Sequence, residues 1–97
     1  RSAADRREQR RAAAEARAAA QHLRQAAREA EKRLEKLQAE RARIEAKLTD
    51  PAVYNGPTRE LMELQLKFGE VKKKIAAAED AWLEAQAAIE QPADTGA

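Results

Sequence analysis

Arginine spacing is the feature of this sequence that most directly indicates chemistry. Arg10, Arg17 and Arg24 recur every seven residues, which places them on one flank of a continuous helix at steps of about 10 Å. A guanidinium group binds phosphate through two parallel hydrogen bonds, so a row of arginines can follow a nucleic-acid backbone. We therefore predict phosphate contacts from these basic residues: Arg6, Arg7, Arg10, Arg11, Arg17, Arg24 and Arg28.

The charge distribution favours the same segment. Residues 1–33 contain ten Lys or Arg against five Asp or Glu, whereas residues 34–97 contain nine against twelve. The net charge of +2 is therefore the sum of +5 in residues 1–33 and −3 in residues 34–97. The alternative interpretation is a solvated face, which is common in charge-rich coiled coils.

A second group of candidate nucleic-acid contacts is the run Lys72, Lys73 and Lys74. Consecutive residues of a helix point about 100° apart, so these three side chains cannot form one flat site. We expect them to contribute to binding less than the arginines do, and solubility is their alternative role.

Residues for catalysis, metal binding or cofactor binding are scarce. The chain has no cysteine, a single histidine at His22 and three scattered glycines, and no serine stands in a nucleophile motif. Carboxylates precede Lys or Arg by four residues, as in Glu63 and Lys67, which is the spacing of helix-stabilising ion pairs. We expect no enzymatic activity, metal, cofactor or small-molecule substrate in this chain, which leaves binding or positioning as its role.

Two heptad series of apolar residues determine the expected fold, with Arg41 as the only non-apolar member. The first comprises Ala13, Ala16, Ala20, Leu23, Ala27, Ala30, Leu34, Leu37, Arg41, Ile44 and Leu48, and the second Leu61, Leu64, Phe68, Val71, Ile75, Ala78, Trp82, Ala85 and Ile89. A 3.5-residue repeat keeps one stripe of each helix facing its partner. The sequence predicts an all-α, two-helix antiparallel coiled-coil hairpin with an overhanging N-terminal helix.

The ends of the two helices follow from caps and breakers. The first helix extends from about Ser2 to Thr49, and Pro51 ends it, with Asp50 as the cap of a short turn. Thr58 is the expected N-cap of the second helix, which ends before Pro92. We predict three parts: a basic helical stalk at 1–17 that continues into the first helix, a hairpin at 18–91 with its turn at 50–57, and a disordered tail at 92–97.

Side-chain packing can be predicted from the short connection. Antiparallel pairing places Arg41 opposite Phe68 and Trp82 over Ala27 and Ala30, so we expect the indole to be largely buried. In the turn, Val53 and Tyr54 are expected to fold back onto the end of the hairpin rather than to form an exposed contact.

The surroundings of the chain are inferred from what the sequence lacks. No apolar run approaches the roughly 20 residues that span a bilayer, and the first residues lack the apolar core of a secretory signal. The absence of cysteine fits a reducing compartment. We expect a cytoplasmic chain without membrane contacts, and weak self-association through the alanine-rich seam from Ala13 to Ala20 is a further possibility.

Three segments together resemble a known family. They are the basic start from Asp5 to Arg24, the turn Leu48-Thr49-Asp50-Pro51-Ala52-Val53-Tyr54, and the stretch Ala81-Trp82-Leu83-Glu84-Ala85-Gln86. Over about residues 5–91 the chain is similar to the C-terminal coiled-coil domain of ABC-F ATPases, in particular the YheS and Uup branches. Family members often carry proline before the Leu-Arg pair, where this chain has His22.

The resemblance implies a parent protein with two ATP-binding cassettes that acts on ribosomes in translation. In such a protein the hairpin is an accessory arm that contacts RNA or, in the Uup branch, DNA. The predicted partners are therefore ribosomal RNA, tRNA or DNA, and the ribosome through the parent protein. The alternative function is a purely structural spacer or a protein-contact hairpin.

Overall fold

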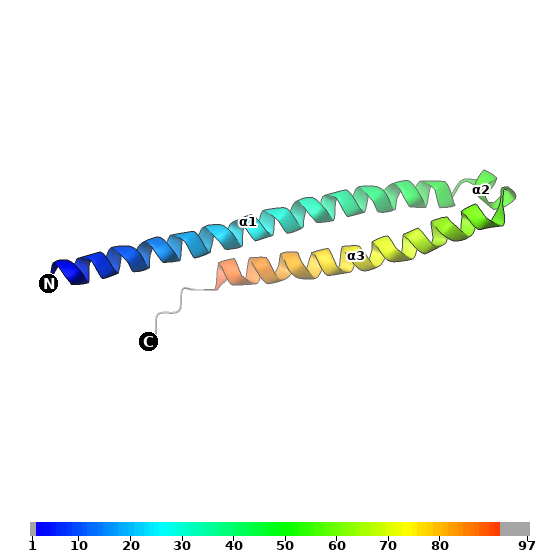
Figure 1. Ribbon diagram of the computed structural model, residues 1–97. Helices are drawn as coiled ribbons and strands as arrows, with labels where there is room; N and C mark the ends of the chain where they lie inside the picture. Colours follow the sequence, from blue (N-terminus) through cyan, green and yellow to red (C-terminus); the bar gives the residue numbers. More distant parts are fainter. Residues whose placement is uncertain (1, 92–97) are drawn as a thin grey trace.

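The computed structural model describes residues 2–91, which form one long hairpin of helices (Figure 1). Helix α1 spans Ala3–Leu48, the short helix α2 spans Pro51–Asn55, and helix α3 spans Thr58–Glu90. Helices α1 and α3 pack side by side in opposite directions, and α2 lies at the tip where the chain turns. The molecule measures 80 × 21 × 16 Å. The predicted antiparallel hairpin is confirmed.

Helix α1 has the ends that the sequence predicts. The hydroxyl of Ser2 accepts a hydrogen bond from the amide of Asp5 at 3.1 Å, so Ser2 is the N-cap. Forty-six residues without Gly or Pro follow, and most of them are strong helix formers. Thr49 is the C-cap, and its amide donates to the carbonyl of Glu45 at 3.0 Å.

The turn between the helices confirms one predicted cap and corrects another. Asp50 caps α2, since its carboxylate accepts a hydrogen bond from the amide of Ala52 at 3.0 Å. The prediction that Thr58 caps α3 is wrong. Pro57 is the N-cap, with its carbonyl accepting from the amide of Glu60 at 3.1 Å and without a side-chain cap. Proline already has the φ of −60° found there, so Thr58 enters as the first helical residue.

The core is a narrow apolar seam between α1 and α3. Its buried cluster consists of Leu37, Ile44, Val71, Ile75 and Ala78, with Leu34, Leu48 and Phe68 packed against it. Val71 is 2 % exposed. All eight residues belong to the two predicted heptad series, so the 3.5-residue repeat identified the faces that pack.

Of two aromatic side chains that were expected to be covered, one is covered and the other is not. Trp82 has most of its surface covered, in line with the prediction, and Ala27, its predicted partner, is 5 % exposed. Tyr54 is 54 % exposed, so the prediction that it folds onto the hairpin end is wrong, whereas Val53 is partly buried. Within residues 2–91, the tip of the hairpin has no further element to enclose the ring of Tyr54.

The first part of α1 has no helix beside it. Every residue from 2 to 19 is exposed, and the first partly covered one is Ala20. Figure 1 shows these turns, in blue, running past the end of α3. At 1.5 Å per residue, the exposed helical part from residue 3 to residue 19 is about 25 Å long. We call it the overhang.

Candidate nucleic-acid interface

The arginines of α1 gather on one side of the helix. At 100° per residue, five of them fall within an arc of about 40° around the helix axis, because α1 is unbroken through this region. They extend over a rise of about 33 Å, from the overhang into the start of the paired part. We call this set the arginine stripe: Arg6, Arg10, Arg17, Arg24 and Arg28.

Acidic residues in the same stretch lie on other faces. By the same helical geometry, Glu8 and Glu15 are turned by roughly 140° to 160° from Arg10. The arginine stripe is therefore flanked by alanine and glutamine rather than by carboxylates until Glu31. Arg10, Arg17 and Arg24 have no carboxylate within one helical turn on the same face.

Hydrogen bonding divides the predicted arginines into two groups. Arg11 forms an ion pair with Glu8 at 2.6 Å, and Arg28 donates to the side-chain oxygen of Gln25 at 2.6 Å. Within residues 2–91, no hydrogen bond or ion pair holds the side chain of Arg10, Arg17 or Arg24. These three guanidinium groups are exposed, so their donors are available to a ligand.

The side chains of the three consecutive lysines of α3, Lys72, Lys73 and Lys74, point in different directions. The Nζ atom of Lys72 lies 4.6 Å from the centre of the Phe68 ring, which Arg41 approaches from α1 at 5.8 Å. This cation–π arrangement covers the edge of the seam and matches the predicted position of Arg41 opposite Phe68. Lys74 lines a groove on another flank, and Lys73 is exposed. The three side chains do not form a common surface.

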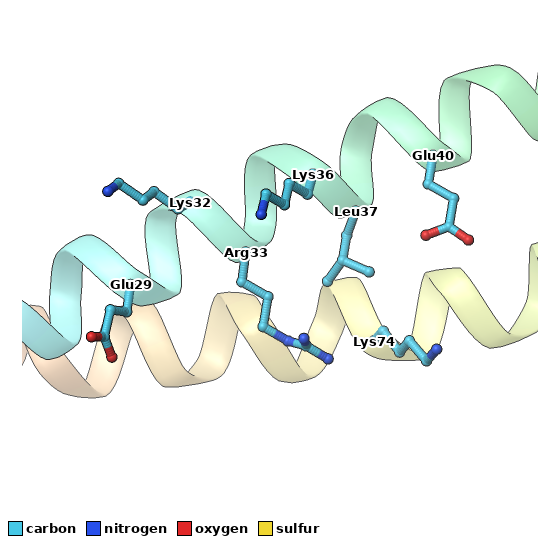
Figure 2. A pocket seen from close by; sticks show the side chains of 7 residues that line it. All are labelled: Glu29, Lys32, Arg33, Lys36, Leu37, Glu40 and Lys74. Atoms are coloured by element: carbon cyan, nitrogen blue, oxygen red, sulfur yellow. The ribbon is translucent and has the colours of Figure 1, made fainter.

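The groove beside Lys74 contains basic residues that the sequence did not single out. It has a volume of about 440 Å³ and is lined by Glu29, Lys32, Arg33, Lys36, Leu37, Glu40 and Lys74. Figure 2 shows Leu37 pointing from α1 toward α3, with Arg33 and Glu40 on either side of it. Two carboxylates share the groove with the four cations, so its surface is of mixed charge.

Sequence reasoning missed this groove for a geometric reason. Lys32 and Lys36 are four residues apart and share a face of α1, a signal that was present in the chain. Lys74 joins them only when α3 is placed beside α1. The groove lies on a different side of α1 from the arginine stripe, since Lys36 is turned by about 80° from Arg28.

Other kinds of site are not formed by the described residues. Within residues 2–91, no group of three or more His, Cys, Asp or Glu side chains is placed to hold a metal ion. His22 is exposed. Glu63, expected beside Lys67, instead accepts a hydrogen bond from Arg59 at 3.3 Å. None of the described helices combines the length and apolar character needed to cross a membrane.

Comparison with known proteins identifies the family of the chain. A family model described as the ABC transporter C-terminal domain matches residues 18–87, which is more than two thirds of the chain. The chain belongs to this family. The match confirms the resemblance drawn from the turn and tryptophan motifs. No curated protein and no solved structure matches the chain.

The matched range of this ABC transporter C-terminal domain separates two parts of the arginine stripe. Arg24 and Arg28 lie inside the match, whereas Arg6, Arg10 and Arg17 precede residue 18. The family relationship therefore covers the paired helices, and most of the stripe lies on the overhang outside it.

Proposed function

We propose that this domain is a nucleic-acid-binding arm of an ABC-F ATPase. The arginine stripe contacts the phosphate backbone of ribosomal RNA, tRNA or DNA and so positions the parent protein, whose two ATP-binding cassettes are outside this chain. The observation that carries the proposal is the gathering of five arginines on one face, three of them without an internal partner.

The geometry suits a backbone better than a small anion. The stripe is convex, exposed and about 33 Å long, and within it no aromatic residue or pair of Asn side chains is present to read bases. Contacts to phosphate position a protein without specifying sequence. We therefore expect binding that is weak, sequence-independent and steeply dependent on salt.

A structural spacer is the second candidate function, and the dimensions of the molecule favour it. A rod 80 Å long and about 20 Å wide can hold two bodies apart without binding nucleic acid. Salt distinguishes the two functions, because a spacer has no phosphate contacts and so no counterions to release.

The decisive experiment replaces Arg10, Arg17 and Arg24 together by Glu. Fluorescence anisotropy with labelled duplex RNA and duplex DNA at low salt should give micromolar or weaker binding for the parent chain and no measurable binding for the triple variant. For the parent, log K should fall against log salt with a slope of about −2.7 to −4.5, corresponding to three to five phosphate contacts.

The matched control replaces Lys72, Lys73 and Lys74 together by Glu, which changes the net charge by the same amount on α3. Binding should weaken much less, because these lysines do not share a face. Circular dichroism should show both variants helical, since none of the six replaced side chains belongs to the buried cluster. Parent-like affinity of the arginine triple, or a larger loss for the lysine triple, would exclude the arm and leave the spacer.

A further inference from the structure

Helix α3 carries a second heptad series on the face opposite the core. Its members are Met62, Leu66, Gly69, Lys73, Ala76, Asp80, Leu83 and Ala87, which follow steps of four and three residues. They lie roughly 180° from Val71 and Ile75 around the helix axis. We call this set the outer stripe, and six of its eight members are apolar or small.

The large side chains of the outer stripe are unusually exposed. Met62, Leu66 and Leu83 are 63 %, 65 % and 57 % exposed. Met62 and Leu66 also line a shallow depression of about 800 Å³ near the turn. A 3.5-residue apolar repeat is the pattern that packs against another helix, yet α1 lies on the other side of α3.

Gly69 points to close approach by a second helix. A Cβ atom built on Gly69 meets nothing within 4 Å, so the hairpin itself has room for alanine at this position. Glycine in a helix interior is a poorer helix former than every residue except proline. Its presence in the middle of the outer stripe, with Ala76 one step of the stripe beyond Lys73, leaves space for another backbone.

We infer that the outer stripe packs against the outer stripe of a second copy of this chain, with the two α3 helices antiparallel. This alignment places Leu66 against Leu83 of the other copy, twice by symmetry, and Met62 against Ala87 at each end. Gly69 and Ala76 lie between these leucine pairs. Large side chains thus meet at two places, and small ones allow the helices to approach between them.

Charge complementarity selects the second copy and its direction. In the antiparallel alignment Lys73 lies within one turn of Asp80 and of Lys73 of the other copy, and Lys72 lies near the other Glu79. The Lys73–Asp80 and Lys72–Glu79 attractions each occur twice by symmetry, whereas the Lys73–Lys73 repulsion occurs once. In a parallel alignment Lys73 would face Lys73 and Asp80 would face Asp80, which is repulsive. Attractions outnumber repulsions only in the antiparallel alignment, which fits a twofold symmetric pair.

Association of this kind is weak, because one face of a single helix buries less than the ~1,600 Å² typical of stable interfaces. Sedimentation equilibrium of the 97-residue chain without nucleic acid should therefore show dimers at protein concentrations on the order of hundreds of micromolar. Leu66→Glu should raise the dimer dissociation constant by about tenfold or more, since it removes two leucine pairs at once. A chain that stays monomeric at these concentrations would refute the proposal.

The matched control is Ala16→Glu, which adds the same side chain to the overhang. It should leave the dissociation constant unchanged. If Ala16→Glu abolishes association and Leu66→Glu does not, the overhang is the interface and the outer stripe is not. Thermal unfolding separates association from folding, because Leu66 is exposed in the hairpin and its replacement should leave the melting of the monomer unchanged.

Exchanged charges test the direction of pairing. Lys73→Asp alone should weaken dimerisation, and the double variant Lys73→Asp with Asp80→Lys should restore it, because the attraction reappears with its signs reversed. Failure of the double variant to recover would contradict the antiparallel alignment.

Cysteine cross-linking provides a second measure of direction, since the chain has no cysteine of its own. Leu66→Cys and Leu83→Cys chains are mixed in equal amounts and oxidised. The mixed disulfide should form several times faster than either homodimer, because only the mixed pair is brought within bonding distance. Preferred linkage of Leu66→Cys to itself would show parallel pairing and overturn the proposal.

Discussion

The overhang and the paired part of α1 are the same helix under two different conditions. Both parts consist largely of strong helix formers, and no Gly or Pro interrupts either. From Ala20 onward the helix buries a stripe that contains Leu37 and Ile44, whereas residues 2–19 bury nothing. Most helical stability in proteins comes from packing of an apolar face. The comparison shows that propensity sets the conformation of the overhang and packing sets the stability of the rest.

The overhang and the paired part of α1 also differ in the charges that they expose. In the overhang the seam positions are alanines, so exposed surface is left to the arginines, and three members of the arginine stripe precede residue 18. In the paired part the seam needs leucine and isoleucine, and charged residues surround it with both signs. A helix that packs against no partner can therefore carry a row of arginines on one face, with Glu8 and Glu15 on another.

The largest effect is expected in the core of the paired part. Ile75→Ala removes a side chain that is 5 % exposed within the central cluster, so it should lower the free energy of unfolding by about 2 to 5 kcal/mol. Urea denaturation followed by circular dichroism measures the change. The control Leu83→Ala removes a side chain that is 57 % exposed, and it should cost less than about 0.5 kcal/mol in the monomer. Equal costs for the two variants would show that the seam is not where the hairpin is stabilised.

Much of this comparison was predictable from the sequence. The heptad series contain all eight residues of the central cluster and its flanks, and antiparallel pairing of the two series places Arg41 beside Phe68, as the structure does. The heptad repeat predicts burial here because each long helix packs against one other helix only. A residue's position in the repeat therefore decides whether its side chain is covered.

The errors arose where a residue's environment depends on more than the repeat. Tyr54 is predicted to be covered but is 54 % exposed, because the tip of the hairpin has no further element to enclose its ring. Thr58 was assigned as a cap because threonine favours that position, yet the carbonyl of Pro57 already accepts the first helical bonds. The groove at Lys74 needed the relative placement of two helices, which residue types alone do not supply.

The same substitution, alanine to glycine, should change the free energy of unfolding by an intermediate amount in the paired part of α1 and hardly at all in the overhang. Ala39→Gly, at an exposed position in the paired part, should lower the free energy of unfolding by about 1 kcal/mol. Ala14→Gly, at an exposed position in the overhang, should change global unfolding by about 0 kcal/mol, because the overhang frays before the hairpin unfolds.

Hydrogen exchange measured by mass spectrometry localises the two effects. Amides of residues 3–17 should exchange rapidly in the parent chain, and those around Leu37 should be protected up to the stability of the hairpin. Strong protection of the overhang, together with a destabilising effect of Ala14→Gly, would mean that the overhang is packed in solution and that the proposed contrast does not hold.

The smallest expected effect is on RNA affinity, and it comes from breaking an ion pair within the overhang. Glu8 holds Arg11 in an exposed ion pair at 2.6 Å, and such pairs are worth about 0.2 to 1 kcal/mol. Glu8→Gln releases Arg11 and removes a negative charge from the basic segment, so affinity for duplex RNA should rise by about two- to threefold at low salt. The matched variant Glu63→Gln breaks the exposed pair with Arg59 on α3 and removes the same charge. If both variants strengthen binding equally, net charge alone attracts the nucleic acid, whereas a gain confined to Glu8→Gln places the contact on the overhang.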